Sequence, residues 1–270
     1  MPELDGKVAI VTGAGRLRGI GRAAAAAYAR LGADVVVTGT GRNPDSFPDD
    51  EKAVKWRDVE STADEVRALG RRALTMTVDV TNQEHVQAMI DGAVAEFGRV
   101  DILVNNAAFA RGADRVPVAD LTPDLFNLVM DIKVGGTFYC TKAFMEQITK
   151  QGEGGKIVNI SSSAGKRGSS NTLAYNAANF AVVGITQSMA REFGPMGVNV
   201  NCVCPGAVDT HRMDDLGRGD TWTNRAANTP IGRNGTDEEI GDFIAYLCTE
   251  AASWIQGQSI NLNGGTIMEH

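Results

Sequence analysis

The sequence has few cysteines and few histidines, and this scarcity limits the kinds of site that it can form. The 270 residues include four cysteines and three histidines. Cys140, Cys202, Cys204 and Cys248 form no CxxC pair and no His/Cys cluster with the spacing of a zinc site. We therefore expect no disulfide bonds and no metal site, which favours a reduced, cytoplasmic protein.

The sequence also lacks long apolar runs and clusters of positive charge. No apolar run reaches the length of a transmembrane helix, and the start of the chain does not have the basic and apolar segments of a signal peptide. The net charge is -7 and the pI is about 5.1, without a Lys/Arg-rich run. Because nucleic acids bind basic surfaces, we expect neither a nucleic acid nor a membrane as a partner.

What the sequence does contain is a regular alternation of short apolar strands with helices. The strands are expected at 7–13, 33–39, 73–80, 100–105, 156–160, 198–204 and 258–263, and the helices at 22–31, from 61, 81–97, 122–147 with a kink at 135–136, 173–186 and 237–249. Such alternation, at 43% hydrophobic residues, predicts one α/β domain over residues 1–270. The fold class is a single-domain Rossmann-type doubly wound parallel sheet with helices on both faces. We interpret 43–58 as an inserted surface loop and 207–236 as a substrate lid.

A glycine-rich loop follows the first expected strand and precedes an alanine-rich helix. It contains Gly13, Gly15, Gly19 and Gly21. In this context glycines let the backbone approach a pyrophosphate, and the helix N-terminus supplies free N–H groups and partial positive charge. The pattern favours a dinucleotide site over a purely structural turn.

The end of the second strand bears on which dinucleotide binds. Enzymes that use NAD usually place a carboxylate there for the ribose 2′-hydroxyl, but the sequence reads Thr38-Gly39-Thr40-Gly41-Arg42. Arg42, Arg16 and Arg18 could surround a 2′-phosphate, although each taken alone is equally typical of a solvated surface residue. The pattern favours NADP(H), with NAD(H) as the other possibility.

Tyr175 and Asn179 lie one helical turn apart in a segment of small and apolar residues. They therefore share one face of a buried helix, where polar groups need partners. One interpretation is a core tyrosine bonded to a carbonyl group. The other is a pair of functional residues.

The chain resembles the classical short-chain dehydrogenase/reductase family over nearly its whole length. The matching motifs are Thr12-Gly13 with Gly19-Ile20-Gly21, Asp79-Val80, Asn105-Asn106-Ala107, Ser162, Tyr175, Pro205-Gly206 through Thr210, and Asn263-Gly264-Gly265. The resemblance implies that the cofactor contacts Gly13, Gly15, Arg16, Arg18, Gly19, Ile20, Thr40, Arg42, Asp79, Val80, Asn105, Ala107, Tyr175, Pro205, Gly206, Val208 and Thr210. It also implies a homotetramer, with a dimer as the next choice, in which the helix around Ala177, Ala178 and Ala181 packs against other subunits.

The chain departs from the family pattern at two positions that carry chemistry. The family has Tyr-x-x-x-Lys where this sequence has Tyr175 and Asn179, and the family's catalytic asparagine is here Lys133. This exchange is similar to that in polyketide-synthase ketoreductase domains. The glycine loop is also about two residues longer than usual, and the family's Asn-Asn-Ala-Gly reads Asn-Asn-Ala-Ala.

The resemblance implies a role for each residue of this set. Tyr175 would be the general acid/base and Ser162 would polarise the substrate oxygen. An ordinary tyrosine, with a pKa near 10, is a poor proton donor and acceptor at neutral pH, so the ammonium of Lys133 would favour its phenolate. Asn179 would hold the ribose or a relay water.

The sequence therefore predicts an oxidoreductase that transfers hydride between NADP(H) and a ketone or secondary alcohol. A catalytically inactive NAD(P)-binding regulatory or partner protein is the alternative, in which Asn179 marks a lost lysine. A sugar epimerase or dehydratase is a third, weaker hypothesis, because such chains usually carry a larger C-terminal substrate domain. The lid residues, which mix both charges with aromatic and apolar side chains, do not identify the substrate.

Overall fold

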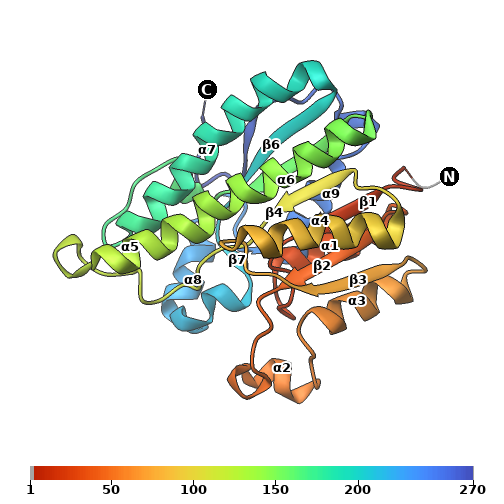
Figure 1. The fold of residues 1–270 in the computed structure, drawn as a ribbon. Helices are drawn as coiled ribbons and strands as arrows, with labels where there is room; N and C mark the ends of the chain where they lie inside the picture. Colours follow the sequence, from red (N-terminus) through yellow and green to blue (C-terminus); the bar gives the residue numbers. More distant parts are fainter. Residues whose placement is uncertain (1–2, 270) are drawn as a thin grey trace.

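A computed structural model describes residues 3–269 as a central parallel sheet with helices on both faces (Figure 1). The seven strands lie in the order β3-β2-β1-β4-β5-β6-β9. Their bounds are β1 Val8–Val11, β2 Asp34–Gly39, β3 Ala73–Thr77, β4 Ile102–Asn105, β5 Gly155–Ile160, β6 Val198–Pro205 and β9 Ser259–Leu262. Every pairing is parallel, so the expected fold class is confirmed.

The helices divide between the two faces of the sheet. Their bounds are α1 Ile20–Arg30, α2 Asp49–Ala53, α3 Val59–Ala68, α4 Gln83–Phe97, α5 Pro123–Met130, α6 Gly136–Gln151, α7 Leu173–Phe193, α8 Asp220–Ala227 and α9 Asp237–Tyr246. One apolar core lies between the sheet and α1, α3 and α9, and the other lies between the sheet and α4, α6 and α7. The side chains of β1, β2 and β4 are buried on both faces, which explains why these strands are continuously apolar.

Two helix starts differ from the sequence-based expectation. The fourth helix is capped by Asn82, whose side chain accepts from the N–H groups of Glu84 and His85, whereas the Thr81 hydroxyl donates to Asp79. The third helix begins at Val59 instead of residue 61, and its N-cap residue Asp58 makes no side-chain capping hydrogen bond. Thr122 caps α5 as expected.

The expected kink at residues 135–136 is present as a π-helical turn. Residues Asp131–Gly135 form this turn between α5 and α6. A β-carbon at Gly136 would lie 2.6 Å from Val80 Cγ2, so only glycine permits this approach of the helix to the segment after β3. Such turns are frequent at functional sites, and Lys133 lies in the middle of this one.

The expected loop at 43–58 and the expected lid at 207–236 both contain regular structure. The insert holds α2 and projects beyond the edge of the sheet (Figure 1). The lid holds α8 and the two short paired strands β7 Val208–Asp209 and β8 Gly235–Thr236. Among residues 3–269, no helix combines the length and apolar character needed to cross a membrane.

Candidate active site

The glycine-rich loop lies between the end of β1 and the N-terminus of α1. Gly13 has φ +68, and a β-carbon at Gly21 would lie 2.7 Å from the Gly13 carbonyl oxygen, so these positions require glycine. In the described chain, α1 has no acidic residue in its first turn and no side-chain cap. A helix N-terminus of this kind fits a pyrophosphate.

The insert packs directly on this loop and is not merely a surface feature. The Leu17 N–H donates to Glu51 Oε1 (3.0 Å), and the Trp56 indole donates to the Gly15 carbonyl (2.7 Å). Glu51 is 1% exposed and Trp56 is also buried. Most residues of the insert at 43–58 are exposed, but the segment also has apolar and charged contacts with the glycine loop.

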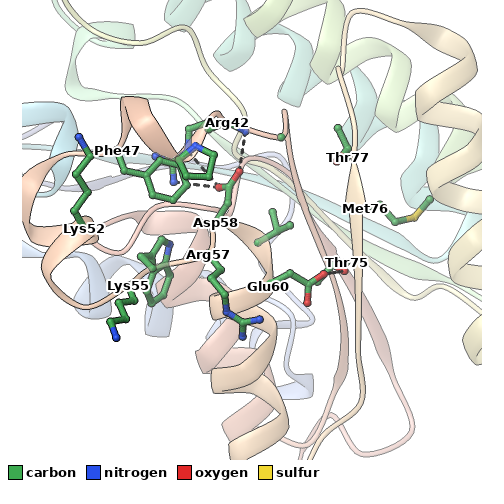
Figure 2. A pocket seen from close by; sticks show the side chains of 14 residues that line it. Arg42, Phe47, Lys52, Lys55, Arg57, Asp58, Glu60, Thr75, Met76 and Thr77 are labelled. Atoms are coloured by element: carbon green, nitrogen blue, oxygen red, sulfur yellow. Dashed lines mark hydrogen bonds and ion pairs between the residues drawn. The ribbon is translucent and has the colours of Figure 1, made fainter.

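Arg42 forms ion pairs with two carboxylates of the insert. Its guanidinium donates to Glu51 Oε2 (2.7 Å), to Asp58 Oδ1 (3.1 Å from Nη2) and to the Gly15 carbonyl (2.7 Å), and it stacks on Phe47. Figure 2 shows the Asp58 carboxylate facing Arg42.

Asp58 also supplies a carboxylate at the end of β2. Its two carboxylate oxygens would each lie 3.8 Å from a β-carbon at Gly39. The expectation of a strand end without an acidic group is therefore wrong. The signal was missed because Asp58 follows β2 by many residues and reaches the strand end only through the fold of the insert.

The other two arginines expected near a 2′-phosphate are also paired. Arg18 binds Asp50 (2.8 Å) in the insert and Asp209 (3.2 Å) in the lid, and Arg16 lies 3.6 Å from Glu51. The carboxylates around Arg18 raise the pKa of its guanidinium. The glycine loop is thus joined by ion pairs to both the insert and the lid.

A pocket of about 740 Å³ lies between the insert and β3 (Figure 2). It is lined by residues between 41 and 77, including Arg42, Trp56, Asp58 and Met76, and by none of the four predicted catalytic residues. It lies beside Gly41 and Arg42, which follow β2, and Tyr175 does not line it.

Lys133 is a buried lysine in the π-helical turn. Only 5% of it is exposed, and its Nζ donates to the Ala107 carbonyl oxygen (3.4 Å) in the loop after β4. Burial lowers the pKa of Lys133 to about 8. The positive charge of Arg212 also lowers this pKa, whereas the nearby Cys202 thiol raises it. The interpretation of Lys133 as a solvated surface residue is therefore excluded.

Asn179 contacts its own helix through its side chain. Its Nδ2 donates to the Tyr175 carbonyl oxygen (2.8 Å), and its own backbone carbonyl accepts from the Ser161 hydroxyl (2.9 Å). The side chain is almost fully buried. In this arrangement Asn179 holds the helix turn that carries Tyr175.

Ser162 lies at the end of β5, where a short helical turn packs against α7. Its Oγ accepts from the Ala164 N–H (3.1 Å), which leaves its hydroxyl proton available to a ligand. Asn176 Nδ2 ties this turn to α7 by donating to the carbonyl oxygens of Ala164 (2.7 Å) and Arg167 (2.9 Å). No sequence motif indicated this positioning role for Asn176, which adjoins Tyr175.

Two arginines flank the Tyr175 ring. The guanidinium carbon of Arg115 lies 3.9 Å from the ring centroid, and that of Arg212 lies 5.0 Å from it. The sequence analysis singled out neither as a site residue, because they come from a loop after β4 and from the lid, segments that only the fold brings to α7.

The remaining predicted cofactor residues fall into two groups. Ala107 and Gly206 lie in the loops that follow β4 and β6, and Thr210 follows β7. Asn105 instead points into the sheet, where its Nδ2 donates to Asn159 Oδ1 (2.9 Å) and Thr141 Oγ1 (3.1 Å). Both amide hydrogens of Asn105 therefore have partners, whereas its Oδ1 is buried without a hydrogen-bond partner in the described chain.

Comparison with known proteins agrees with this architecture. The family model described as Enoyl-(Acyl carrier protein) reductase matches residues 13–266. A short chain dehydrogenase/reductase of Aspergillus oryzae is 37% identical over 268 residues, covering 97% of this chain and 95% of that protein. The cis-4-hydroxycyclohexanecarboxylate dehydrogenase of Sinomonas cyclohexanicum is 36% identical over 263 residues, covering 96% of each.

A solved structure agrees equally well. The crystal structure of a putative short-chain alcohol dehydrogenase from Sinorhizobium meliloti 1021 superposes with a TM-score of 0.86 at 29% identity, covering 98% of this chain and 97% of that one. The family match spans nearly the whole chain, and it includes the glycine loop, Ser162 and Tyr175. This chain belongs to the short-chain dehydrogenase/reductase family.

Proposed function

We propose that the protein is an oxidoreductase that interconverts a secondary alcohol and a ketone, with Tyr175 as the general acid/base. The observation that carries the proposal is the charged environment of Tyr175. Two arginines flank the Tyr175 ring, and a buried lysine lies in the π-helical turn that packs against the same helix. Asn176 joins that helix to the turn after Ser162.

In alcohol oxidation Tyr175 takes the O–H proton of the substrate, and a bound nicotinamide would accept the hydride from its C–H bond, which leaves a ketone. A bound nicotinamide cofactor supplies only the hydride acceptor or donor. Ser162 donates a hydrogen bond to the substrate oxygen and stabilises its developing negative charge. Lys133 supplies the positive charge that favours the Tyr175 phenolate. In ketone reduction the same groups act in reverse.

Asn179 has a smaller part in this proposal than the sequence suggested. Its Nδ2 is already bonded to the Tyr175 carbonyl oxygen, so it positions Tyr175 and does not hold a relay water in this arrangement. In this proposal Lys133 therefore supplies the positive charge, and Asn179 positions Tyr175.

The preferred form of the cofactor depends on the ion pairs around Arg42. The expectation of NADP(H) required an unpaired Arg42 and a strand end without a carboxylate. Because Arg42 is bonded to Glu51 and Asp58, a 2′-phosphate would meet two carboxylates, whereas a free ribose hydroxyl could donate to Asp58. These contacts support NAD(H) as the preferred form.

The relatives support the reaction class by their names. One is named for the oxidation of a hydroxycyclohexane carboxylate, and another carries only the family name. The alternative of an inactive cofactor-binding protein is less well supported, because Lys133 is buried beside the site instead of being a surface residue.

A direct test is a spectrophotometric screen of purified protein with NADH and NADPH against a panel of ketones, and with NAD and NADP against secondary alcohols. We expect turnover that Tyr175→Phe removes while cofactor binding persists. If fluorescence shows that the protein binds cofactor but no combination of cofactor and substrate is turned over, the inactive alternative is favoured.

A further inference from the structure

The Arg115 guanidinium is charged and has no hydrogen-bond partner among the described residues. Within residues 3–269, its buried Nε and Nη1 donate to no partner, and the only carboxylate within 4 Å is that of Asp114, 3.6 Å from Nε. Burial lowers the pKa of Arg115, a cost that Asp114 only partly offsets. A half-buried guanidinium in this state is suited to a ligand.

Arg212 is the second such group. Its Nη1 donates to the Phe109 carbonyl oxygen (2.6 Å), a neutral acceptor, and no carboxylate of the described chain lies within 4 Å of it. Arginines elsewhere in the site differ. Arg18 and Arg42, for example, each bind carboxylates at 2.8 Å or less.

Both free guanidiniums contact the same tyrosine. A guanidinium that lies over an aromatic ring keeps its N–H groups in its own plane, where they can bind a carboxylate with two parallel hydrogen bonds. Arg115 and Arg212 therefore present donors beside the proposed proton-transfer residue.

The local charge balance matches a single negative charge. Asp114 partly balances Arg115, and Arg111 is paired with Asp215 of the lid. Lys133 is assigned to the tyrosine. Arg212 then remains as the one uncompensated charge, so a monoanion fits this region better than a dianionic phosphate.

We propose that Arg115 and Arg212 bind the carboxylate of the substrate, so that the substrate class is a small hydroxy acid or keto acid. This assignment rests on the proposed function. The two arginines come from different segments, one after β4 and one in the lid, so a bound carboxylate would also hold the lid closed over Tyr175.

The test compares each keto acid with its neutral methyl ester in the wild-type enzyme. Suitable pairs are 4-oxopentanoate and 3-oxocyclohexanecarboxylate with their methyl esters, and dihydroxyacetone phosphate serves as the phosphate arm. We expect kcat/KM to be at least 10-fold higher for the acid than for its ester in at least one pair. The carboxylate assignment would be overturned if every methyl ester were reduced as efficiently as its acid. A preference for dihydroxyacetone phosphate over the acids would also overturn it.

Variants then assign the effect to the two arginines. Arg115→Met and Arg212→Met are each expected to lower kcat/KM for the preferred acid by at least 10-fold, mainly by raising KM. The same variants are expected to change kcat/KM for the methyl ester by less than threefold. Arg218→Met is the matched control, because Arg218 stacks on Trp222 and is paired with Asp209 (2.6 Å). An equal loss for acid and ester would show that the arginines serve only Tyr175, and would overturn the proposal.

Binding without turnover separates this proposal from the proposed function. Cyclohexanecarboxylate, which cannot be reduced, is expected to protect the wild-type protein from thermal unfolding in the presence of cofactor, and to protect Arg115→Met much less. If no ketone of either class is reduced, the proposed function fails, and this binding result still decides whether the arginines take a carboxylate. Equal protection of wild type and variant would overturn the assignment.

Discussion

Lys133 Nζ donates a hydrogen bond to the Ala107 carbonyl oxygen, and this contact joins the π-helical turn to the loop after β4. The lysine is therefore held inside the protein, at the carboxyl edge of the sheet. A buried ammonium is costly, and its retention in the core of a dehydrogenase fold is consistent with a role in chemistry.

The first prediction concerns activity. Lys133→Ala is expected to lower kcat by about 100-fold or more, because the phenolate of Tyr175 loses its electrostatic support. Steady-state rates measured from pH 6 to 10 check this effect.

Lys142→Ala is the matched control, because Lys142 lies on the surface of α6 and pairs with Glu146 (2.9 Å). It should leave the rate and the pH profile unchanged. A Lys133→Ala enzyme with wild-type rate and pH profile would show that the activating charge lies elsewhere.

The second prediction concerns stability. The pKa of Lys133 falls from 10.5 to about 8 on folding, so the unfolded chain binds more protons between these two values. The free energy of unfolding contributed by this group therefore rises with pH from about 8 to 10.5, and the full penalty of the buried charge applies below pH 8. Lys133→Met should raise the stability at pH 7 by on the order of 1–3 kcal/mol.

Thermal unfolding of the cofactor-free protein at pH 7 and pH 10 tests this prediction. The gain from Lys133→Met should be larger at pH 7 than at pH 10. A variant that is less stable than wild type at pH 7 would mean that packing around the aliphatic stem outweighs the cost of the charge.

The third prediction concerns the exchanged pair. Asn179→Ala removes one neutral hydrogen bond to the Tyr175 carbonyl, so it should cost about 1 kcal/mol and lower the rate far less than Lys133→Ala. The double variant Lys133→Asn with Asn179→Lys restores the arrangement usual in the family. It should recover part of the activity that Lys133→Asn loses.

Kinetics of the two single variants and the double variant measure the coupling between these positions. A double variant no more active than Lys133→Asn alone would show that a lysine at 179 cannot place its charge beside Tyr175 in this protein.

The fourth prediction concerns the cofactor. Wild type is expected to use NADH more efficiently than NADPH, because Glu51 and Asp58 face the expected ribose site. Glu51→Gln removes one of the carboxylate charges paired with Arg42. This change should lower the KM for NADPH several-fold and change the KM for NADH by less than threefold.

Glu65→Gln provides a control, since Glu65 pairs with Arg22 on α1, away from Arg42. Initial rates at varied cofactor concentration give the four constants. A wild-type enzyme that prefers NADPH would show that Arg42 exchanges its carboxylate partners for the 2′-phosphate, as the sequence alone suggested.

The fifth prediction concerns assembly, which was expected to be a homotetramer. Phe138 on α6 is 48% exposed and Phe180 on α7 is 46% exposed, as at a surface that another subunit covers. Ala177 and Ala181 are half-buried, but Ala178 is buried within its own subunit. Phe138→Glu should shift the protein toward smaller species in light scattering, and a wild-type monomer at micromolar concentration would contradict the prediction.

The sequence by itself determined the order of strands and helices, because the central strands β1 and β2 are buried on both faces and therefore continuously apolar. It also located the glycine loop, Ser162 and Tyr175, since each belongs to a short motif whose spacing is local. A glycine pair near Lys133 marked the break in its helix, but the burial of Lys133 is a finding of the structure.

Only the tertiary structure decided which charges meet. Asp58 reaches the end of β2 from the far end of an insert, and Arg115 and Arg212 reach Tyr175 from two separate segments. Ion pairs between residues distant in sequence leave no periodic pattern, because they depend on how loops fold back on the sheet. For this reason the sequence predicted the reaction class through its motifs, whereas the proposed cofactor form and substrate charge rest on contacts that the fold creates.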